Sequence, residues 1–141
     1  MRAPVGYQQH ILVIDESPEI LLVMREILCE EGYRVSLRPN PDRCVEEATS
    51  LAPDLIIIDF PWNAVENRWT LLEGLHHDDN TSAIPVILCT GSAREVSDHR
   101  VRLDEMGIPI VLKPFDIESL LMEINARLCK RHLSPGADGS G

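Results

Sequence analysis

Several features that direct a chain to a membrane or to secretion are missing from this sequence. It has no run of about 18 apolar residues, the length that a membrane-spanning helix needs. Residues 1–7 lack the apolar segment of a signal peptide. No Cys-x-x-Cys pair occurs among Cys29, Cys44, Cys89 and Cys129, which argues against a metal site or a disulfide framework. We therefore expect a cytoplasmic protein with reduced thiols and no membrane partner.

Positive charge is also scarce. The chain carries 13 Lys and Arg against 23 Asp and Glu, a formal net charge of −10. Binding to a nucleic acid needs clustered cations, so a nucleic acid is not expected as a direct partner. With 141 residues, 44% of them hydrophobic, the chain has the size and composition of one domain with a packed core.

Short apolar runs are what the sequence does contain. Four of them are rich in β-branched residues and show no polar alternation, which is typical of strands buried on both faces of a parallel sheet. A fifth, weaker run alternates and is expected at an edge of the sheet. The four buried runs are residues 10–14, 55–58, 84–89 and 108–112, and the alternating run is residues 33–37.

Helical patterns fill the intervals between these runs. The first helix is predicted to begin after Ser17, a good N-cap, with Pro18 in its first turn and Gly32 as its stop. Later helices are predicted after Asn40-Pro41, around Leu71, Leu72 and Leu75, after a Ser92/Glu95 capping box, and after Asp116.

Strand and helix thus alternate five times. This order predicts an α/β fold of three layers, a doubly wound, five-stranded parallel sheet of the flavodoxin-like type with strand order 2-1-3-4-5. We expect an N-terminal extension over residues 1–8, the domain over 9–131, and a flexible tail or linker over 132–141.

The residues that follow the strands are the candidates for function, because doubly wound sheets bind ligands at the carboxyl ends of their strands. Converging carboxylates repel one another, and a hard divalent cation such as Mg²⁺ would relieve that repulsion. A lysine and a hydroxyl added to such a site suit phosphoryl transfer. The candidates are Asp15 and Glu16, Asp59, Thr90 and Gly91, and Lys113 and Pro114.

These sets, in this order, resemble the receiver domain of response regulators in two-component signalling, and the resemblance covers residues from about 9 to 130. No single motif is specific, but the four together are. The segments that carry the resemblance are Ile11-Leu12-Val13-Ile14-Asp15-Glu16, Pro53-Asp54-Leu55-Ile56-Ile57-Ile58-Asp59, Ile84-Pro85-Val86-Ile87-Leu88-Cys89-Thr90-Gly91 and Lys113-Pro114-Phe115.

The resemblance implies a role for each candidate. Asp59 would accept the phosphoryl group from a histidine kinase, a histidine phosphotransfer protein or a small phosphodonor. Glu16, Asp59 and the main-chain carbonyl of Pro61 would bind Mg²⁺, with Asp15 acting through water. Thr90, Gly91 and Lys113 would contact the phosphoryl group, and Pro114 would be the cis-proline beside the lysine. Such a domain signals through protein contacts and is not an enzyme.

Two departures from the family pattern concern what surrounds Asp59. Residues 60–69 contain a proline at the second position after the acceptor, Pro61, and no glycine. Because proline offers no side chain to orient a hydrolytic water, we expect slow self-dephosphorylation. Ile110 stands where the family often has Tyr or Phe, which suggests a muted or altered switch. Trp62 and Trp69 are expected on a loop beside the site, either partly buried or as a docking surface.

Two alternatives stay open at this stage. The altered loop and Ile110 are compatible with a pseudo-receiver, a module that binds partners without being phosphorylated. A flavodoxin-like cofactor binder is the weaker alternative, because the first strand is not followed by a Gly-rich or Ser/Thr-rich phosphate loop.

Overall fold

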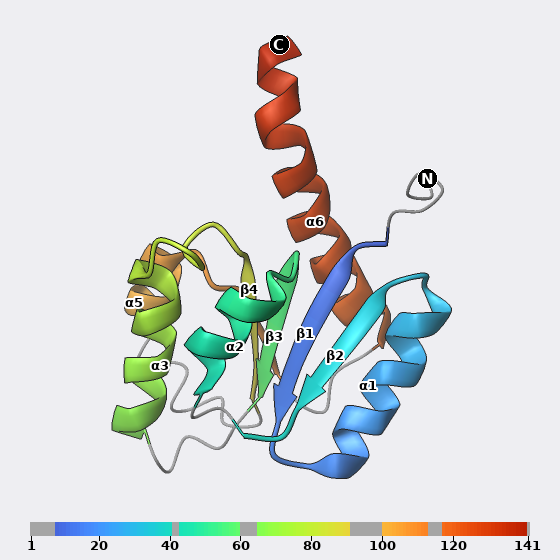
Figure 1. Ribbon diagram of the computed structural model, residues 1–141, viewed down its shortest axis with the longest axis vertical. Helices are drawn as coiled ribbons and strands as arrows, with labels where there is room; N and C mark the ends of the chain where they lie inside the picture. The colour runs from blue at the N-terminus through green and yellow to red at the C-terminus, as the bar shows by residue number, and fades with distance from the viewer. Residues whose placement is uncertain (1–7, 41–42, 60–64, 91–99, 113–116, 141) are drawn as a thin grey trace.

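The protein folds around a five-stranded parallel sheet in the order β2-β1-β3-β4-β5, which confirms the predicted strand order (Figure 1). The computed structural model describes residues 8–40, 43–59, 65–90, 100–112 and 117–140. The alternating run forms the edge strand β2, as expected. The strands are β1 (His10–Asp15), β2 (Arg34–Arg38), β3 (Leu55–Asp59), β4 (Val86–Thr90) and β5 (Ile110–Leu112).

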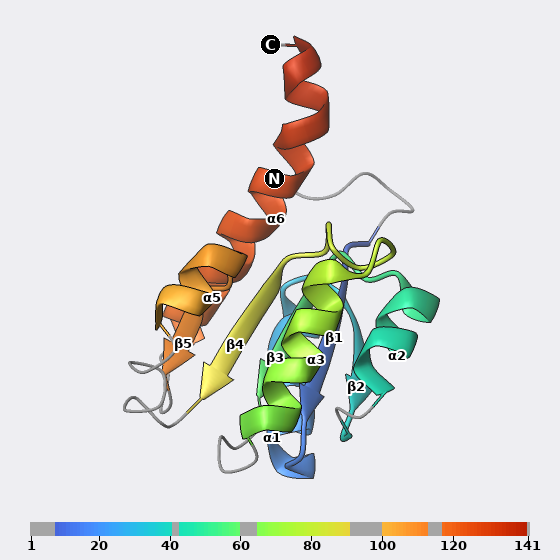
Figure 2. The same ribbon diagram turned by 90° about the vertical axis from the view of Figure 1, so that its left-hand side faces the viewer.

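Helices cover both faces of this sheet and complete the predicted three layers (Figure 2). One core cluster joins α1 and α6 to one face, and a second joins α2, α3 and α5 to the other. The helices are α1 (Pro18–Glu30), α2 (Cys44–Leu51), α3 (Val65–His77), α5 (Arg100–Met106) and α6 (Ile117–Ser140).

The central strands are buried on both sides, which explains why their sequences do not alternate. Residues 11–14 of β1 and 55–58 of β3 are each at most 1% exposed. Complete burial of one such aliphatic side chain contributes roughly 1.5–3 kcal/mol. Strand β2 differs, because only Val35 and Leu37 pack against the core while Arg34 is exposed.

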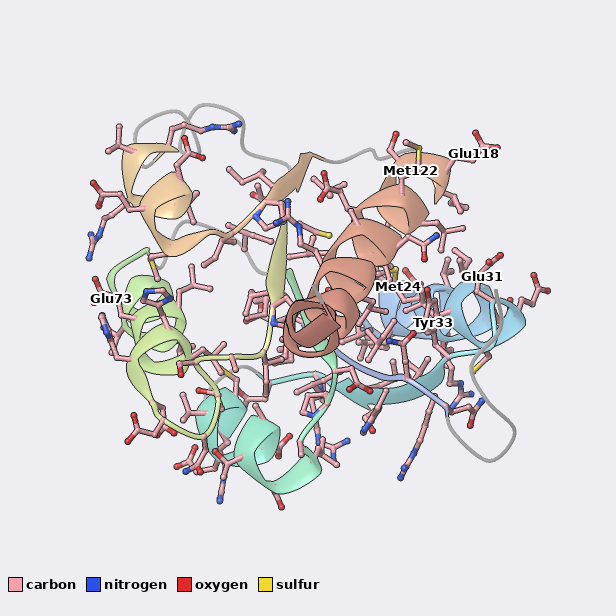
Figure 3. All side chains as sticks on the ribbon, turned by 90° about the horizontal axis from the view of Figure 1, so that it is seen from above. Met24, Glu31, Tyr33, Glu73, Glu118 and Met122 are labelled. Atoms are coloured by element: carbon pink, nitrogen blue, oxygen red, sulfur yellow. The ribbon has the colours of Figure 1, made fainter. Side chains whose placement is uncertain are left out.

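Helix α1 begins as its sequence predicts. Ser17 is the N-cap, and its hydroxyl accepts a hydrogen bond from the Ile20 backbone N–H at 3.4 Å. Gly32, beyond the helix end, has a φ of +94°, a conformation that favours glycine. Met24 of α1 lies inside, near α6, whereas Met122 and Glu118 of α6 point outward (Figure 3). Over residues 117–128, helix α6 thus buries one face and exposes the other.

The structure differs from expectation in two segments. Residues 65–69 belong to α3, so Trp69 stands on a helix and not on a loop; no glycine or proline interrupts this stretch. Helix α6 continues to Ser140 and extends past the sheet (Figure 1), where composition predicts a flexible tail over 132–141. Continuing an existing helix costs far less than starting one.

The predicted helix starts at Pro41, at the Ser92/Glu95 capping box and at Asp116 lie outside the described residues. Of the helices that the structure describes, none combines the length and hydrophobicity that crossing a membrane requires.

Candidate functional site

Asp15 and Asp59 end two neighbouring strands at the same edge of the sheet. In the pairing of β1 with β3, Asp15 lies directly opposite Asp59. Adjacent strands lie about 4.8 Å apart, so the register brings the two backbones into close proximity. The sequence predicts that these two acidic residues converge, and the strand register places their backbones close enough for this.

The carboxylate of Asp15 is held in place by the start of α1. Asp15 is only 4% exposed, and its Oδ1 accepts a hydrogen bond from the Ser17 backbone N–H at 2.8 Å. The amino end of α1, which follows at Pro18, carries the positive end of the helix dipole. Both features favour a negative charge at this position, which lies at the end of a buried strand.

Thr90 completes the row on the next strand. It ends β4, which pairs with β3, and it is 2% exposed. Asp59 pairs with Cys89, the residue before Thr90, and Thr90 itself pairs with Leu112 of β5. The sheet therefore brings the backbones of Asp15, Asp59 and Thr90 together at the carboxyl edge of its three central strands.

Cys89 is a neighbour of Asp59 that sequence reasoning did not single out. Its side chain is 1% exposed and packs in the core cluster of α1 and α6. Only the register of β3 against β4 shows that Cys89 lies opposite Asp59, and this register cannot be deduced from the sequence of each strand alone.

Glu16 follows Asp15 and is exposed, so its carboxylate is accessible from solvent. Asp15 and Glu16 are oxygen donors of the kind that Mg²⁺ prefers, and the chemistry of the donor set therefore fits that ion. Among the side chains that the structure describes, no three His, Cys, Asp or Glu gather into a metal-ligand cluster. The Asp59 side chain is outside that set, as are Pro61, Gly91, Lys113 and Pro114.

Ile110 starts β5 and lies opposite Leu88 of β4. It is partly buried and packs against the core cluster that contains Leu103 of α5 and Ile108. The position that departs from the family pattern is therefore occupied by an aliphatic side chain packed against the face of the sheet that α5 covers.

Comparison with known proteins identifies the family to which this arrangement belongs. The model of the response regulator receiver domain matches residues 11–125. The chain belongs to the response regulator receiver domain family. It is thus a receiver domain of the kind found in two-component signalling, with the CheY-like fold that the sheet order indicates.

Relatives of known sequence include both short and long proteins. Protein PilH of Pseudomonas aeruginosa is 33% identical over 119 residues, covering 84% of this chain and 96% of that protein. The DNA-binding dual master transcriptional regulator RpaA of Synechocystis is 30% identical over 127 residues, covering 90% of this chain but 52% of RpaA. The chain spans about half the length of several curated relatives that it matches.

Solved structures show the same fold. A CheY-like receiver domain protein from Methanospirillum hungatei superposes with a TM-score of 0.78 at 23% identity, covering 91% of this chain and 99% of that one. The receiver domain of sensor histidine kinase PA1611 from Pseudomonas aeruginosa superposes with a TM-score of 0.71 at 21% identity, covering 86% of this chain and 98% of that one. That second structure holds a magnesium ion in its active-site cleft.

Proposed function

We propose that Asp59 accepts a phosphoryl group from the phosphohistidine of a histidine kinase or a histidine phosphotransfer protein. The observation that supports this most directly is the register that sets Asp15 opposite Asp59, with Thr90 ending the adjacent strand. A carboxylate oxygen of Asp59 attacks phosphorus and forms a P–O bond. The P–N bond of the donor breaks, and its electron pair leaves with the imidazole.

The acidic residues would hold the Mg²⁺ that such transfer needs. Asp59, Glu16 and the main-chain carbonyl of Pro61 are the proposed direct ligands, and Asp15 acts through water. The Asp15 carboxylate supports this role because it is buried and a hydrogen bond from the Ser17 N–H fixes its position. The bound ion would supply positive charge to the phosphoryl oxygens.

The remaining proposed contacts come from the ends of β4 and β5. Thr90 would donate its hydroxyl to the phosphoryl group, Gly91 would leave room for it, and Lys113 would neutralise an oxygen. Pro114 would set the backbone after the lysine as a cis-proline. The domain would act in the cytoplasm as a signalling module that assists only its own phosphorylation and dephosphorylation. Its output would be a change in contact with another protein.

The test is phosphorylation by acetyl phosphate in the presence of Mg²⁺, followed by intact-mass measurement. The protein should gain the mass of one phosphoryl group, and Asp59→Asn should gain none. Asp79→Asn, which changes an exposed aspartate beyond α3, is the matched control and should behave as the wild type. Equal labelling of Asp59→Asn and the wild type would contradict the proposal.

A pseudo-receiver is the second candidate, and the packing of Ile110 favours it. Ile110 is an aliphatic residue packed against the core cluster, and it has no polar group that could move between the core and the solvent. Addition of beryllofluoride with Mg²⁺ separates the two candidates. A chemical-shift change at Thr90 supports the proposal that Asp59 accepts a phosphoryl group. The pseudo-receiver is supported if Thr90 shows no change and if Asp59→Asn binds protein partners as the wild type does.

A further inference from the structure

The pairing of β1 with β3 receives little register information from its apolar side chains. Residues 11–14 read Ile-Leu-Val-Ile and residues 55–58 read Leu-Ile-Ile-Ile, and all are buried. In a strand with one polar face, a slip by one residue would turn apolar side chains toward solvent. Here a slip would exchange aliphatic side chains of similar volume between two apolar faces, so burial alone distinguishes the registers weakly.

The connection between the two strands does not fix their register either. It contains α1, β2 and α2, so it is a long crossover and not a tight turn. The free energy of closing a long connection depends only weakly on its length. A shift of one strand by a single residue is therefore compatible with the connection, and polar contacts at the strand ends must supply the discrimination.

Asp54 makes such a contact at the amino end of the pair. Its Oδ2 accepts a hydrogen bond from the His10 backbone N–H at 2.8 Å. Its own backbone N–H donates to the His10 carbonyl oxygen at 2.7 Å. One residue thus binds both main-chain polar groups of His10, and His10 is only 6% exposed. A slipped register would leave these buried polar groups without their partners, at a cost of about 1–3 kcal/mol for each group.

The position of this contact relates directly to the site. His10 opens β1 and Asp15 closes it, while Asp54 immediately precedes β3 and Asp59 closes that strand. The number of residues from His10 to Asp15 equals the number from Asp54 to Asp59. Holding His10 against Asp54 at one edge of the sheet therefore brings Asp15 opposite Asp59 at the other.

We propose that Asp54 is a positioning residue that sets the register of β1 against β3 and thereby places Asp15 beside Asp59. Its side chain acts on the far end of the strands through the backbone ladder and touches neither the metal nor the phosphoryl group. In its consequence for Mg²⁺ and phosphoryl binding this inference rests on the proposed function. The register itself does not depend on it.

The experiment compares Asp54→Ala with Asp54→Asn by two measurements. Inter-strand NOEs between Val13 and Ile57 and between Asp15 and Asp59 report the register directly. Titration with Mg²⁺ alone reports the site. Asp54→Ala should lose the native NOEs, or show them together with the NOEs of a second register. It should also bind Mg²⁺ about tenfold more weakly, the lower end of the loss in affinity typical for residues that orient metal ligands. Asp54→Asn keeps an oxygen acceptor for the His10 N–H and should restore both.

Thr81→Val is the matched control for lost stability. Thr81 is 1% exposed, and its hydroxyl donates to the Leu75 carbonyl at 2.7 Å, so this variant also loses a buried hydrogen bond but away from β1 and β3. It should retain the NOEs and the Mg²⁺ affinity. If Asp54→Ala does not fold, Asp54→Glu takes its place, because the added methylene displaces the acceptor while keeping its charge.

Native NOEs and wild-type Mg²⁺ affinity in Asp54→Ala, or in Asp54→Glu where it is needed, would overturn the inference. So would a failure of Asp54→Asn to restore them. If the wild type itself binds no Mg²⁺, the proposed function fails, and the NOEs alone then decide the register.

Discussion

Asp15 lies directly opposite Asp59 in the pairing of β1 with β3, and the Asp15 side chain is almost completely buried. Two carboxylate charges about 5 Å apart, at an effective dielectric constant between about 20 and 80, repel each other by roughly 1–3 kcal/mol. If the proposed Mg²⁺ site lies between these two residues, a repulsion of this order should destabilise the metal-free protein.

Removing one of these charges should stabilise the metal-free protein. Asp15→Asn keeps an oxygen acceptor for the Ser17 N–H, so the start of α1 should be preserved. We expect its free energy of unfolding without metal to rise by about 1 kcal/mol, and the extra stability conferred by Mg²⁺ to shrink. Urea denaturation with and without Mg²⁺ measures both. Asp79→Asn should leave both unchanged, and an unchanged Mg²⁺ effect in Asp15→Asn would contradict a role of Asp15 in metal binding.

Two exposed aliphatic residues on α1 are candidates for the surface that docks the proposed protein donor. Leu22 and Val23 are 53% and 51% exposed, on the helix that begins just after Asp15. Helix α1 follows β1 directly, so its start lies near the edge of the sheet where Asp59 ends β3. Changing both residues to Ala should slow transfer from a phosphorylated histidine phosphotransfer protein about tenfold, because the complex would bury less apolar surface.

The same double variant should be phosphorylated by acetyl phosphate at the wild-type rate, since a small donor needs no docking surface. Val101→Ala provides the control, because Val101 is a 71% exposed aliphatic residue on α5. Equal slowing by Val101→Ala would show that the effect is not specific to α1.

His10 should make the stability of the domain depend on pH. Burial is the main cause that lowers the pKa of His10, Arg34 and Arg38 lower it further, and Asp54 opposes them. The folded protein therefore binds fewer protons than the unfolded chain, and stability falls as the pH drops through about 6.5 toward the folded pKa. The loss amounts to about 1.4 kcal/mol for each unit by which the pKa is lowered.

His10→Gln removes this titration and retains a group that can hydrogen-bond the Ser36 hydroxyl, which lies 2.7 Å from His10 Nε2. Urea denaturation at a series of pH values between about 5 and 8 should show a flatter profile for this variant than for the wild type. His77→Gln, which alters an exposed histidine, should keep the wild-type profile. Identical profiles for His10→Gln and the wild type would exclude His10 as the cause.

The fold was predictable because the sequence of each central strand by itself indicates burial on both faces. Uninterrupted aliphatic runs such as residues 55–58 can be stable only between two layers, and that requirement leads to a doubly wound sheet. The residues at the strand ends were predictable for the same reason, since Asp15, Asp59 and Thr90 each end a run.

Contacts between segments distant in sequence were not predictable in this way. The hydrogen bonds between Asp54 and His10 join segments that are 44 residues apart, and neither residue has a composition that signals the other. The position of Cys89 opposite Asp59 likewise follows from register, which the uniform apolar pattern does not encode. The helical content of residues 65–69 was hidden by their mixed polarity, because their sequence shows no clear helical period of apolar residues.

Gly74 shows how closely α2 and α3 pack. A Cβ atom at this position would lie 3.2 Å from Cγ2 of Val45. Alanine in a helix interior is favoured over glycine by about 1 kcal/mol, but the β-branched Val45 side chain is stiff in its own helix and cannot easily move away. We expect Gly74→Ala to destabilise the wild type and to stabilise a Val45→Ala background by about 1 kcal/mol. A double-mutant cycle by urea denaturation measures this reversal, and equal effects in both backgrounds would contradict it.

We expect the lifetime of the proposed aspartyl phosphate to depend on the second residue after Asp59. Pro61 has no side chain that could orient a water molecule for attack on phosphorus, so the wild type should lose its phosphoryl group over minutes or longer and not over seconds. Pro61→Glu supplies an acceptor for that water and should shorten the lifetime by about a hundredfold, the lower end of the range of general-base effects. Pro61→Ala also has no acceptor for that water and should stay close to the wild type, as followed by intact mass after removal of acetyl phosphate. A wild-type half-life of seconds, or equal acceleration by Ala and Glu, would show that the side chain at this position does not control hydrolysis.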